Sequence, residues 1–245
     1  MAKVLEDYLY YEEKDPDLKI YHGDCLEIMP LLPKVDLVVT DPPYGMSFQS
    51  NYRLIKHSEI DGDDELPVEL INMARIKANR ASYFFCRWDN LYQMPKPKSV
   101  LAWVKNNWSM GDLKHEHGRQ WEACCFYAAD GHEFNERIPD VIRDDRTGNA
   151  LHPTQKPVGL FRRIIECNVG EPILDPFLGS GTTLVACKEL NRNGIGIEIN
   201  EKYCEIAKKR LRATCKPLFR DEPKPRKEDA ELWTKQSEAQ GREGV

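Results

Sequence analysis

The sequence predicts an α/β protein built on a doubly wound, mostly parallel sheet. Short apolar runs that end at turn residues alternate with longer segments of helical periodicity, which is the pattern of parallel strands joined by crossover helices. Hydrophobic residues make up 41% of the 245 residues and charged residues 31%, so the chain can bury a sizeable core. A sheet of this kind binds its ligands outside the carboxyl ends of the strands.

In the N-terminal half, the clearest strand is Val35–Thr40 (VDLVVT), which is short, apolar and β-branched like other buried parallel strands. It ends at Asp41 because the two prolines that follow lack the N–H that a ladder needs. The other elements expected before residue 90 are, in order, a strand that begins at 19–21, a helix over 26–32, a polar loop over 45–64, a helix over 66–80 capped by Asp63 or Asp64, and a strand over 81–86.

In the C-terminal half, apolar residues recur at helical spacing over 157–167, and Asn200 is suited to cap a further helix. The elements expected after residue 90 are, in order, strands over 100–104 and 123–128, a polar loop over 131–150, a helix over 157–167, a strand over 172–174, a glycine turn at 179–181, a helix over 184–190, a strand over 194–199 and a helix to about residue 213. Prolines and charges then predict a disordered tail over 216–245.

Charge is distributed unevenly around a net value of −5. Residues 1–69 carry six Lys/Arg against sixteen Asp/Glu, whereas residues 71–119 carry nine against three, with tryptophans interleaved. Such a basic, aromatic-rich segment is a candidate for contact with a phosphate backbone. On charge alone, solvated faces around ordinary core aromatics are the favoured explanation. The candidate DNA contacts are Lys96, Lys98, Lys105, Lys114 and Arg119.

The sequence also bears on the cellular compartment. No apolar run approaches the roughly 18 residues of a spanning helix, and the acidic N-terminus does not have the pattern of a signal peptide. Eight irregularly spaced cysteines are expected to be reduced thiols. We therefore expect a cytoplasmic protein without membrane contacts.

The first candidate site is the tetrapeptide Asp41-Pro42-Pro43-Tyr44, at the end of the expected strand. The two prolines fix φ and hold the Asp41 carboxylate and the neighbouring carbonyl in a rigid turn. Tyr44 adds a flat ring beside these acceptors. This arrangement suits a planar substrate that bears an amino group, and the alternative is a plain turn with a satisfied aspartate.

The second candidate site is the run DPFLGSGTT over 175–183, whose glycines let a ligand approach the backbone at a helix N-terminus. It is not a Walker loop, because no Gly-Lys-Ser/Thr follows, and Leu184 stands where a dinucleotide fingerprint has its third glycine. Glu198 ends the next strand about 20 residues on, where an acidic side chain can hold ribose hydroxyls. Together, these features predict a cofactor that contains a nucleoside.

Several separated motifs in one order give the sequence a resemblance to the S-adenosylmethionine-dependent amino-methyltransferases that act on DNA, in their permuted β group. Over about residues 19 to 213, the matching motifs are the two sites above, HGDCLE at 22–27, WVK at 103–105 with GDL at 111–113, and HPTQKP at 152–157. The resemblance implies a Rossmann-like sheet in permuted methyltransferase order, with an inserted target-recognition segment.

The resemblance also implies a role for each matched residue. Asp41 and the carbonyl of Pro42 would accept hydrogen bonds from the target amine, Tyr44 would stack on the base, and Pro43 completes this catalytic motif. Two acceptors favour a pyramidal nitrogen that attacks the sulfonium methyl after the base has flipped out of the stack. The cofactor-binding residues that it implies are Asp24 for the adenine, Glu198 for the ribose, Thr154 and Lys156 near the carboxylate, and Asp175, Phe177, Gly179, Gly181 and Thr183 in the methionine-side loop.

The implied reaction is methyl transfer from S-adenosylmethionine to the N6 amine of adenine in double-stranded DNA. We expect a methyltransferase domain over 1–87 and 147–215, a target-recognition segment over 88–146, part of which continues the sheet, and the tail. The family leaves open a homodimer and a restriction endonuclease that acts on the same site. No code connects the sequence to the DNA site recognised.

Cytosine-N4 methylation remains the main alternative, because it uses similar geometry, commonly with Ser in the place of Asp41. Asparagine at that place would resemble the glutamine-modifying relatives. Methylation at cytosine C5 is disfavoured because no cysteine follows a proline, as the nucleophile of that family typically does.

Other classes fit the motifs less well. A DNA-binding module that has lost catalysis is disfavoured by the intact Asp41 and Glu198, and an NAD-dependent oxidoreductase by Leu184 and the Asp-Pro-Pro-Tyr motif. Zinc at His115, His117, Cys124 and Cys125 is disfavoured because adjacent cysteines on a strand point to opposite faces and no Cys-x2-Cys is present. We expect no metal site.

Overall fold

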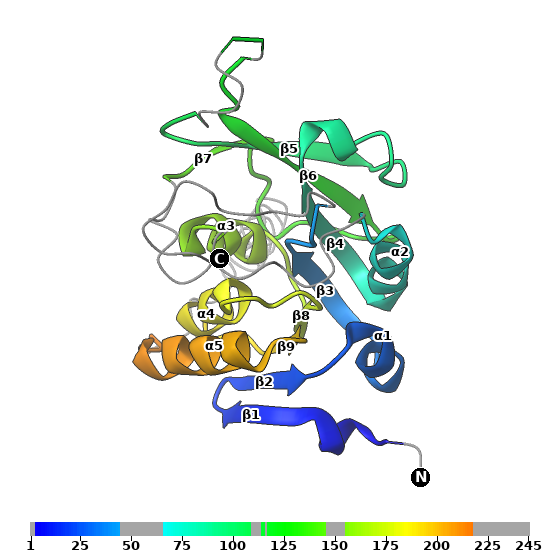
Figure 1. Ribbon diagram of the computed structural model, residues 1–245, viewed down its shortest axis with the longest axis vertical. Helices are drawn as coiled ribbons and strands as arrows, with labels where there is room; N and C mark the ends of the chain where they lie inside the picture. Colours follow the sequence, from blue (N-terminus) through cyan, green and yellow to red (C-terminus); the bar gives the residue numbers. More distant parts are fainter. Residues whose placement is uncertain (1–2, 45–65, 109–113, 116, 146–154, 218–245) are drawn as a thin grey trace, which may run out of the picture.

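In the part of the chain that the computed structural model describes (residues 3–44, 66–108, 114–115, 117–145 and 155–217), nine strands form one sheet in the order β1-β2-β9-β8-β3-β4-β6-β5-β7 (Figure 1). The strands are β1 Leu9–Lys14, β2 Asp17–His22, β3 Val35–Thr40, β4 Ala78–Cys86, β5 Ser99–Val104, β6 Trp121–Ala128, β7 Val141–Arg143, β8 Ile173–Asp175 and β9 Gly194–Glu198. The α-helices are α1 Cys25–Ile28, α2 Val68–Lys77, α3 Val158–Glu166, α4 Thr182–Glu189 and α5 Glu201–Ala213, and the 3-10 turns are η1 Leu5–Tyr8, η2 Met29–Leu31 and η3 Trp88–Asn90.

The centre of the sheet is parallel, as expected. β2, β9, β8, β3 and β4 are parallel neighbours, and β3 is buried along almost its whole length. Both faces of such strands are covered, which explains the nearly continuous apolar run of VDLVVT. The carboxyl ends of these five strands therefore lie at one edge of the sheet.

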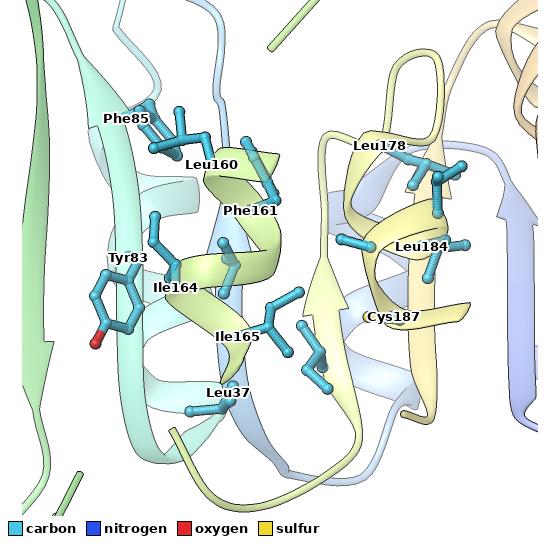
Figure 2. Packing of buried hydrophobic residues seen from close by; sticks show 14 of the residues in the cluster. Leu37, Tyr83, Phe85, Leu160, Phe161, Ile164, Ile165, Leu178, Leu184 and Cys187 are labelled. Carbon is cyan, nitrogen blue, oxygen red and sulfur yellow. The ribbon is translucent and has the colours of Figure 1, made fainter. Parts of the chain in front are cut away.

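Helices cover both faces (Figure 1). α3, α4 and α5 pack on one face and α1 and α2 on the other, each over its own apolar cluster. The apolar residues at helical spacing in α3 are all buried, and the ring of Phe161 stacks on that of Phe85 in β4 at 5.2 Å between centroids (Figure 2). The periodicity of this segment thus predicted correctly which face of the helix meets the sheet.

The strand order reverses between β3 and β8, which are adjacent and parallel. The helix that follows β3 along the chain covers one face, and the helix that follows β8 covers the other. Such a reversal leaves a crevice outside the strand ends, which is where doubly wound sheets bind their ligands. Thr40 and Asp175 end these two strands.

The segment 88–146 continues the sheet, and it does so with antiparallel pairing. β6 runs antiparallel to β4 and to β5, and β7 runs parallel to β5 at the far edge. Because β6 starts where β4 ends, Trp121 and Glu122 lie at the same edge of the sheet as the carboxyl ends of the parallel strands.

The structure corrects several expected boundaries. The helix expected over 66–80 ends at Lys77, because Ala78 already pairs with Val35 as the first residue of β4, and Pro67 rather than Asp63 or Asp64 stands at its N-cap. β7 lies within the expected loop over 131–150, and β1 in the mixed N-terminal segment that no periodicity marked. Both are edge strands, whose exposed side chains give a weak signal.

Of the remaining expectations, the helix cap at Asn200 is confirmed, and a loop and the tail lie largely outside the described residues. Asn200 caps α5 as expected, since its side chain accepts a hydrogen bond from the N–H of Lys202. The expected loop over 45–64 and nearly all of the expected tail lie outside the described residues. Among the helices of the described part, none is long and apolar enough to cross a bilayer.

Candidate active site at the carboxyl ends of the strands

A cavity of about 350 Å³ opens at the edge where β3, β8 and β9 end. It brings together residues from both candidate sites and from two of the other matched motifs. The site residues expected from the sequence that line it are Asp24, Asp41, Pro42, Pro43, Tyr44, Lys156, Asp175, Phe177, Gly179, Thr183 and Glu198. Thr154 lies outside the described residues. Within those residues, no group of three or more His, Cys, Asp or Glu side chains is placed to hold a metal ion.

Glu198 ties the glycine loop to the end of β9. Its Oε2 accepts a hydrogen bond from the N–H of Gly179 at 2.7 Å, and its Oε1 accepts one from the N–H of Asn200 at 2.9 Å. The same side chain lines the cavity, where a carboxylate can accept hydrogen bonds from hydroxyl groups of a ligand. Glu198 can therefore shape the loop and contact a ribose at the same time.

Asp175 joins the two candidate sites. Its Oδ1 accepts hydrogen bonds from the hydroxyl of Thr40 at 2.5 Å and from the N–H of Phe177 at 3.1 Å, and its Oδ2 accepts one from the hydroxyl of Thr183. The side chain is nearly inaccessible, and burial raises its pKa to about 6 against these hydrogen bonds. Because Thr40 directly precedes Asp41, Asp175 fixes the start of the Asp-Pro-Pro-Tyr turn.

Gly181 has a structural role. Its φ of 87° is in the left-handed region, and a Cβ there would lie 2.7 Å from the Cβ of Ala207 in α5. Glycine thus permits α4 and α5 to approach closely, and Gly181 is absent from the residues that line the cavity. Asp24 lines the cavity as the N-cap of α1, where its Oδ1 accepts a hydrogen bond from the N–H of Leu26 at 2.8 Å.

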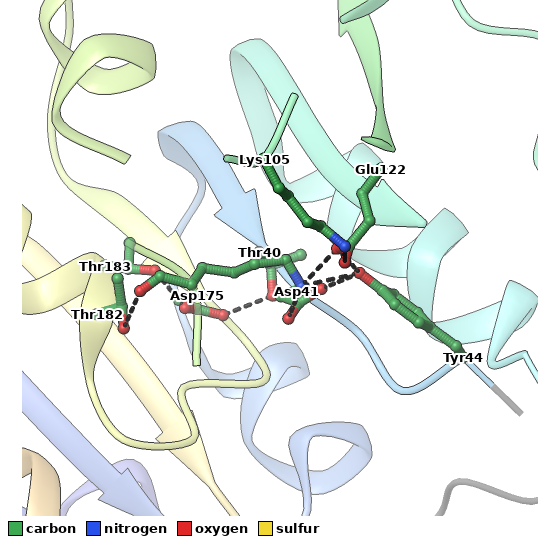
Figure 3. Close-up of polar contacts among 9 residues, drawn as sticks. Thr40, Asp41, Tyr44, Lys105, Glu122, Asp175, Thr182 and Thr183 are labelled. Carbon is green, nitrogen blue, oxygen red and sulfur yellow. Dashed lines mark hydrogen bonds and ion pairs between the residues drawn. The ribbon is translucent and has the colours of Figure 1, made fainter. Parts of the chain in front are cut away.

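Asp41, Tyr44 and Lys156 form the polar centre of the site, and Figure 3 labels the first two of these residues. The hydroxyl of Tyr44 donates to Oδ1 of Asp41 at 2.5 Å, and the ammonium of Lys156 lies 2.5 Å from Oδ2 of Asp41 and 3.0 Å from the hydroxyl of Tyr44. The backbone carbonyl of Tyr44 accepts a hydrogen bond from the side chain of Asn90 at 2.9 Å. The structure therefore places Lys156 against the Asp-Pro-Pro-Tyr motif.

Burial controls the charges in this centre. It raises the pKa of Asp41 above its ordinary value, although the Lys156 ammonium offsets part of the effect. Burial lowers the pKa of Lys156, but the carboxylates of Asp41 and Glu122 outweigh it and leave the pKa above its ordinary value. The pKa of Tyr44 is also raised, first by burial and then by the Asp41 charge. Asp41 and Lys156 thus form an ion pair in which Tyr44 remains protonated.

Two further charged residues adjoin this centre: Glu122, which the sequence did not single out, and Lys105, which it indicated as a DNA contact. Glu122 Oε2 lies 3.1 Å from the ammonium of Lys156, and its other oxygen pairs with the ammonium of Lys105 (Figure 3). Burial raises the pKa of Glu122, but the two ammonium groups more than compensate and lower it to about 2. The signal that could have found Glu122 is an acidic residue at the start of an otherwise apolar strand.

Comparison with known proteins decides the family. A sequence model of the family described as DNA methylase, for enzymes that modify N6 or N4 amines, matches residues 83–209. A putative methylase of Escherichia coli K12, YubD, is 30% identical over 212 residues, which are 80% of this chain and 90% of the relative. The chain belongs to the N6/N4 DNA methylase family.

Other methylases agree with this membership. The type II methyltransferase M2.MboI of Moraxella bovis is 28% identical over 82% of this chain and 90% of its own length, and M.HpaI of Haemophilus parainfluenzae is 58% identical over 62 residues, 24% of this chain and 20% of its own length. Among solved structures, the complex of M1.HpyAVI with S-adenosylmethionine is 28% identical over 79% of this chain and 98% of that chain, with a TM-score of 0.62. The cytosine-N4-specific PvuII methyltransferase, at 14% identity over 82% of this chain and 95% of its own, with a TM-score of 0.56, shares the fold.

The five candidate DNA contacts of this methylase separate into three groups. Lys96 and Lys98 precede the amino end of β5, whereas Asp41 follows the carboxyl end of β3. Lys105 is 8% exposed and paired with Glu122, which argues against a contact with the DNA backbone. Lys114 and Arg119 lie in the connection between β5 and β6, at the same edge as Asp41.

Proposed function

We propose that this methylase transfers a methyl group from S-adenosylmethionine to the N6 amine of an adenine flipped out of duplex DNA. The observation that carries the proposal is a buried carboxylate, Asp41, that opens onto the same cavity as the glycine loop and Glu198. A hydrogen-bond acceptor for an amine and the residues of a nucleoside site are thereby within one pocket. Asp41, where cytosine-N4 enzymes commonly carry Ser, favours adenine.

The residues of the cavity fit S-adenosylmethionine. Glu198 and Asp24 provide carboxylate oxygens for the hydroxyl and amino groups of a nucleoside, and Phe177 and Ile199 provide apolar surface. The related M1.HpyAVI has been solved with this cofactor, and the family match supports the same cofactor here. Lys156, Asp175, Gly179, Thr183 and Thr154 complete the proposed cofactor-binding set, and Gly181 shapes its loop. When bound, the cofactor supplies an electrophilic sulfonium methyl group.

The residues around Asp41 act by positioning and electrostatics. An adenine amine is a poor nucleophile because its lone pair is conjugated with the ring. The Asp41 carboxylate and the Pro42 carbonyl would accept its two hydrogens and favour a pyramidal nitrogen, while the Tyr44 ring stacks on the base. Pro43 keeps this turn rigid. The stack offsets part of the cost of flipping the base.

The position of segment 88–146 supports a role in target recognition. The connection between β5 and β6 lies at the edge of the sheet where the parallel strands end, and it carries Lys114 and Arg119. We include duplex DNA as the partner of this edge. The family includes both restriction-linked and solitary enzymes, so a restriction endonuclease with the same target and a second copy of the chain stay open as partners.

The test is transfer of a tritiated methyl group from S-adenosylmethionine to bacterial genomic DNA prepared from a methylation-deficient host. The account expects incorporation by the wild-type protein and almost none by the Asp41→Ala variant. A wild-type protein that binds the cofactor but modifies none of several unmethylated genomes would overturn the proposal.

A further inference from the structure

A row of alternating charges leads away from the catalytic motif. Asp41 pairs with Lys156 at 2.5 Å, Lys156 lies 3.1 Å from Glu122, and Glu122 pairs in turn with Lys105. The last two residues belong to the antiparallel part of the sheet: Glu122 is in β6 opposite Trp103, and Lys105 directly follows β5. Two strands that contribute no residue to the lining of the cavity thus reach the carboxylate of Asp41.

Lys156 is held more firmly than one ion pair would require. Its side chain is 5% exposed, and its ammonium lies 5.2, 5.5 and 5.9 Å from the ring centroids of Tyr44, Phe85 and Trp103. A buried ammonium is tolerated when it is paired and surrounded by aromatic faces. With two carboxylates and two ammonium groups, the four charges cancel, which removes the cost of an uncompensated buried charge.

We propose that Glu122 and Lys105 are positioning residues that divide the ammonium of Lys156 between two carboxylates, Asp41 and Glu122, and thereby set the charge state of Asp41. The inference rests on the proposed function, since it makes Asp41 the group that must be ionised to accept the target amine. When an amine approaches Asp41, the ammonium of Lys156 can move away from the Asp41 carboxylate. It remains paired, because Glu122 is its second partner.

The charges predict opposite effects of two substitutions. Glu122 is a negative neighbour that raises the pKa of Asp41, so Glu122→Gln should lower that pKa. Lys105 balances Glu122, so Lys105→Gln leaves Glu122 to draw Lys156 away from Asp41 and should raise the pKa of Asp41. A purely structural ion pair between β5 and β6 would change stability in both variants without opposite shifts in this titration.

Other groups near Asp41 have to be separated in the measurement. They are Tyr44, the Asp175 carboxyl, whose own pKa is about 6, and the thiols of Cys86 and Cys124, whose pKa values burial and neighbouring groups raise. A titration followed on Asp41 alone, by NMR of ¹³C-labelled aspartate carboxyls assigned with Asp41→Asn, distinguishes it from Asp175.

The deciding experiment is this titration in the wild-type chain and in Glu122→Gln and Lys105→Gln. A neighbouring charge can shift a pKa by about 1–3 units. We therefore expect the titration midpoint of Asp41 to fall by about one pH unit in Glu122→Gln and to rise by about one in Lys105→Gln. Glu122→Asp keeps the charge and should stay near the wild type. Glu189→Gln, which removes a carboxylate from an exposed pair with Arg162, is the matched control and should leave the midpoint in place.

The acid limb of methyl transfer to genomic DNA should follow the same shifts. Unchanged midpoints of Asp41, or shifts of the same sign in both variants, would overturn the inference. If Glu122→Gln does not fold, the midpoint of Asp41 in Lys105→Gln decides: a rise supports the inference and no rise overturns it. If the two variants show opposite shifts but the wild-type chain transfers no methyl group to DNA, the proposed function is overturned and the electrostatic role of Glu122 and Lys105 remains.

Discussion

The hydroxyl of Tyr44 donates a hydrogen bond of 2.5 Å to Oδ1 of Asp41. The other carboxylate oxygen of Asp41 faces the ammonium of Lys156, so both oxygens are already engaged before any amine arrives. A carboxylate oxygen has two acceptor positions, and a target amine therefore has to use the remaining one or displace the tyrosine. Tyr44 thus both occupies the acceptor and provides the ring on which the base would stack.

Substitutions of Tyr44 should separate these two roles. Tyr44→Phe keeps the ring and releases one contact to Asp41, so turnover should change little. Tyr44→Ala loses the stack, which is worth about 1–3 kcal/mol, and turnover on DNA should fall roughly 5- to 150-fold. Single-turnover kinetics on unmethylated genomic DNA measure both variants, and equal losses in Phe and Ala would contradict a stacking role.

Removing the carboxylate of Asp41 should abolish turnover and spare the cofactor. Loss of one preorganised electrostatic contact costs on the order of 10²–10³ in rate, and Asp41→Ala should lose at least that much. Asp41→Asn keeps the shape of the side chain and is the matched control for folding. Calorimetry should find nearly wild-type affinity for S-adenosylmethionine in both variants, whereas a large loss of affinity would show that Asp41 belongs to the cofactor site.

Substitution of Glu198 should weaken cofactor binding more than it slows the methyl-transfer step. Glu198→Ala removes the acceptor of the Gly179 and Asn200 N–H groups as well as the proposed ribose contact. Hydrogen bonds to a charged group contribute about 1.5–3 kcal/mol, so the Kd for S-adenosylmethionine should rise roughly 10- to 150-fold. Unchanged affinity by calorimetry, with a folded protein confirmed by thermal denaturation, would remove Glu198 from the site.

The position of the cations predicts which of them bind DNA. Lys114→Glu with Arg119→Glu should weaken binding to every duplex, and each lost phosphate contact should reduce the salt slope by about 0.9. Lys96→Glu with Lys98→Glu changes the charge equally before the amino end of β5 and should have a smaller effect. Fluorescence anisotropy over a salt series measures both, and a larger effect of the second pair would place the DNA elsewhere.

Much of the fold follows from local sequence patterns. Buried strands such as VDLVVT and amphipathic helices such as α3 need few distant contacts to be recognised, because burial on defined faces imposes their periodicity. The sequence did not predict β1 and β7, because these edge strands are stabilised by pairing with β2 and β5 rather than by a hydrophobic pattern of their own. The end of α2 was misplaced for the same reason, since pairing with β3 extends β4 backward to Ala78.

The candidate site was predictable where a motif carries its own geometry. The prolines after Asp41 and the glycines of the loop fix local backbone shape, and most of the residues that the sequence singled out beside them line the cavity. The partnership of Lys156 with Glu122 joins residues far apart in the chain, and the burial of Lys105 depends on strand pairing. Only the folded sheet brings these charges together, and net charge along the sequence gave no sign of it.

The identity of the modified base tests the central claim most directly. DNA from a methylation-deficient host is incubated with the wild-type chain and S-adenosylmethionine, digested to nucleosides and analysed by mass spectrometry against standards. The account predicts N6-methyladenine, absent when Asp41→Ala replaces the wild type. N4-methylcytosine would contradict the choice of target, and N6-methyladenine formed at the wild-type rate by Asp41→Ala would contradict the mechanism.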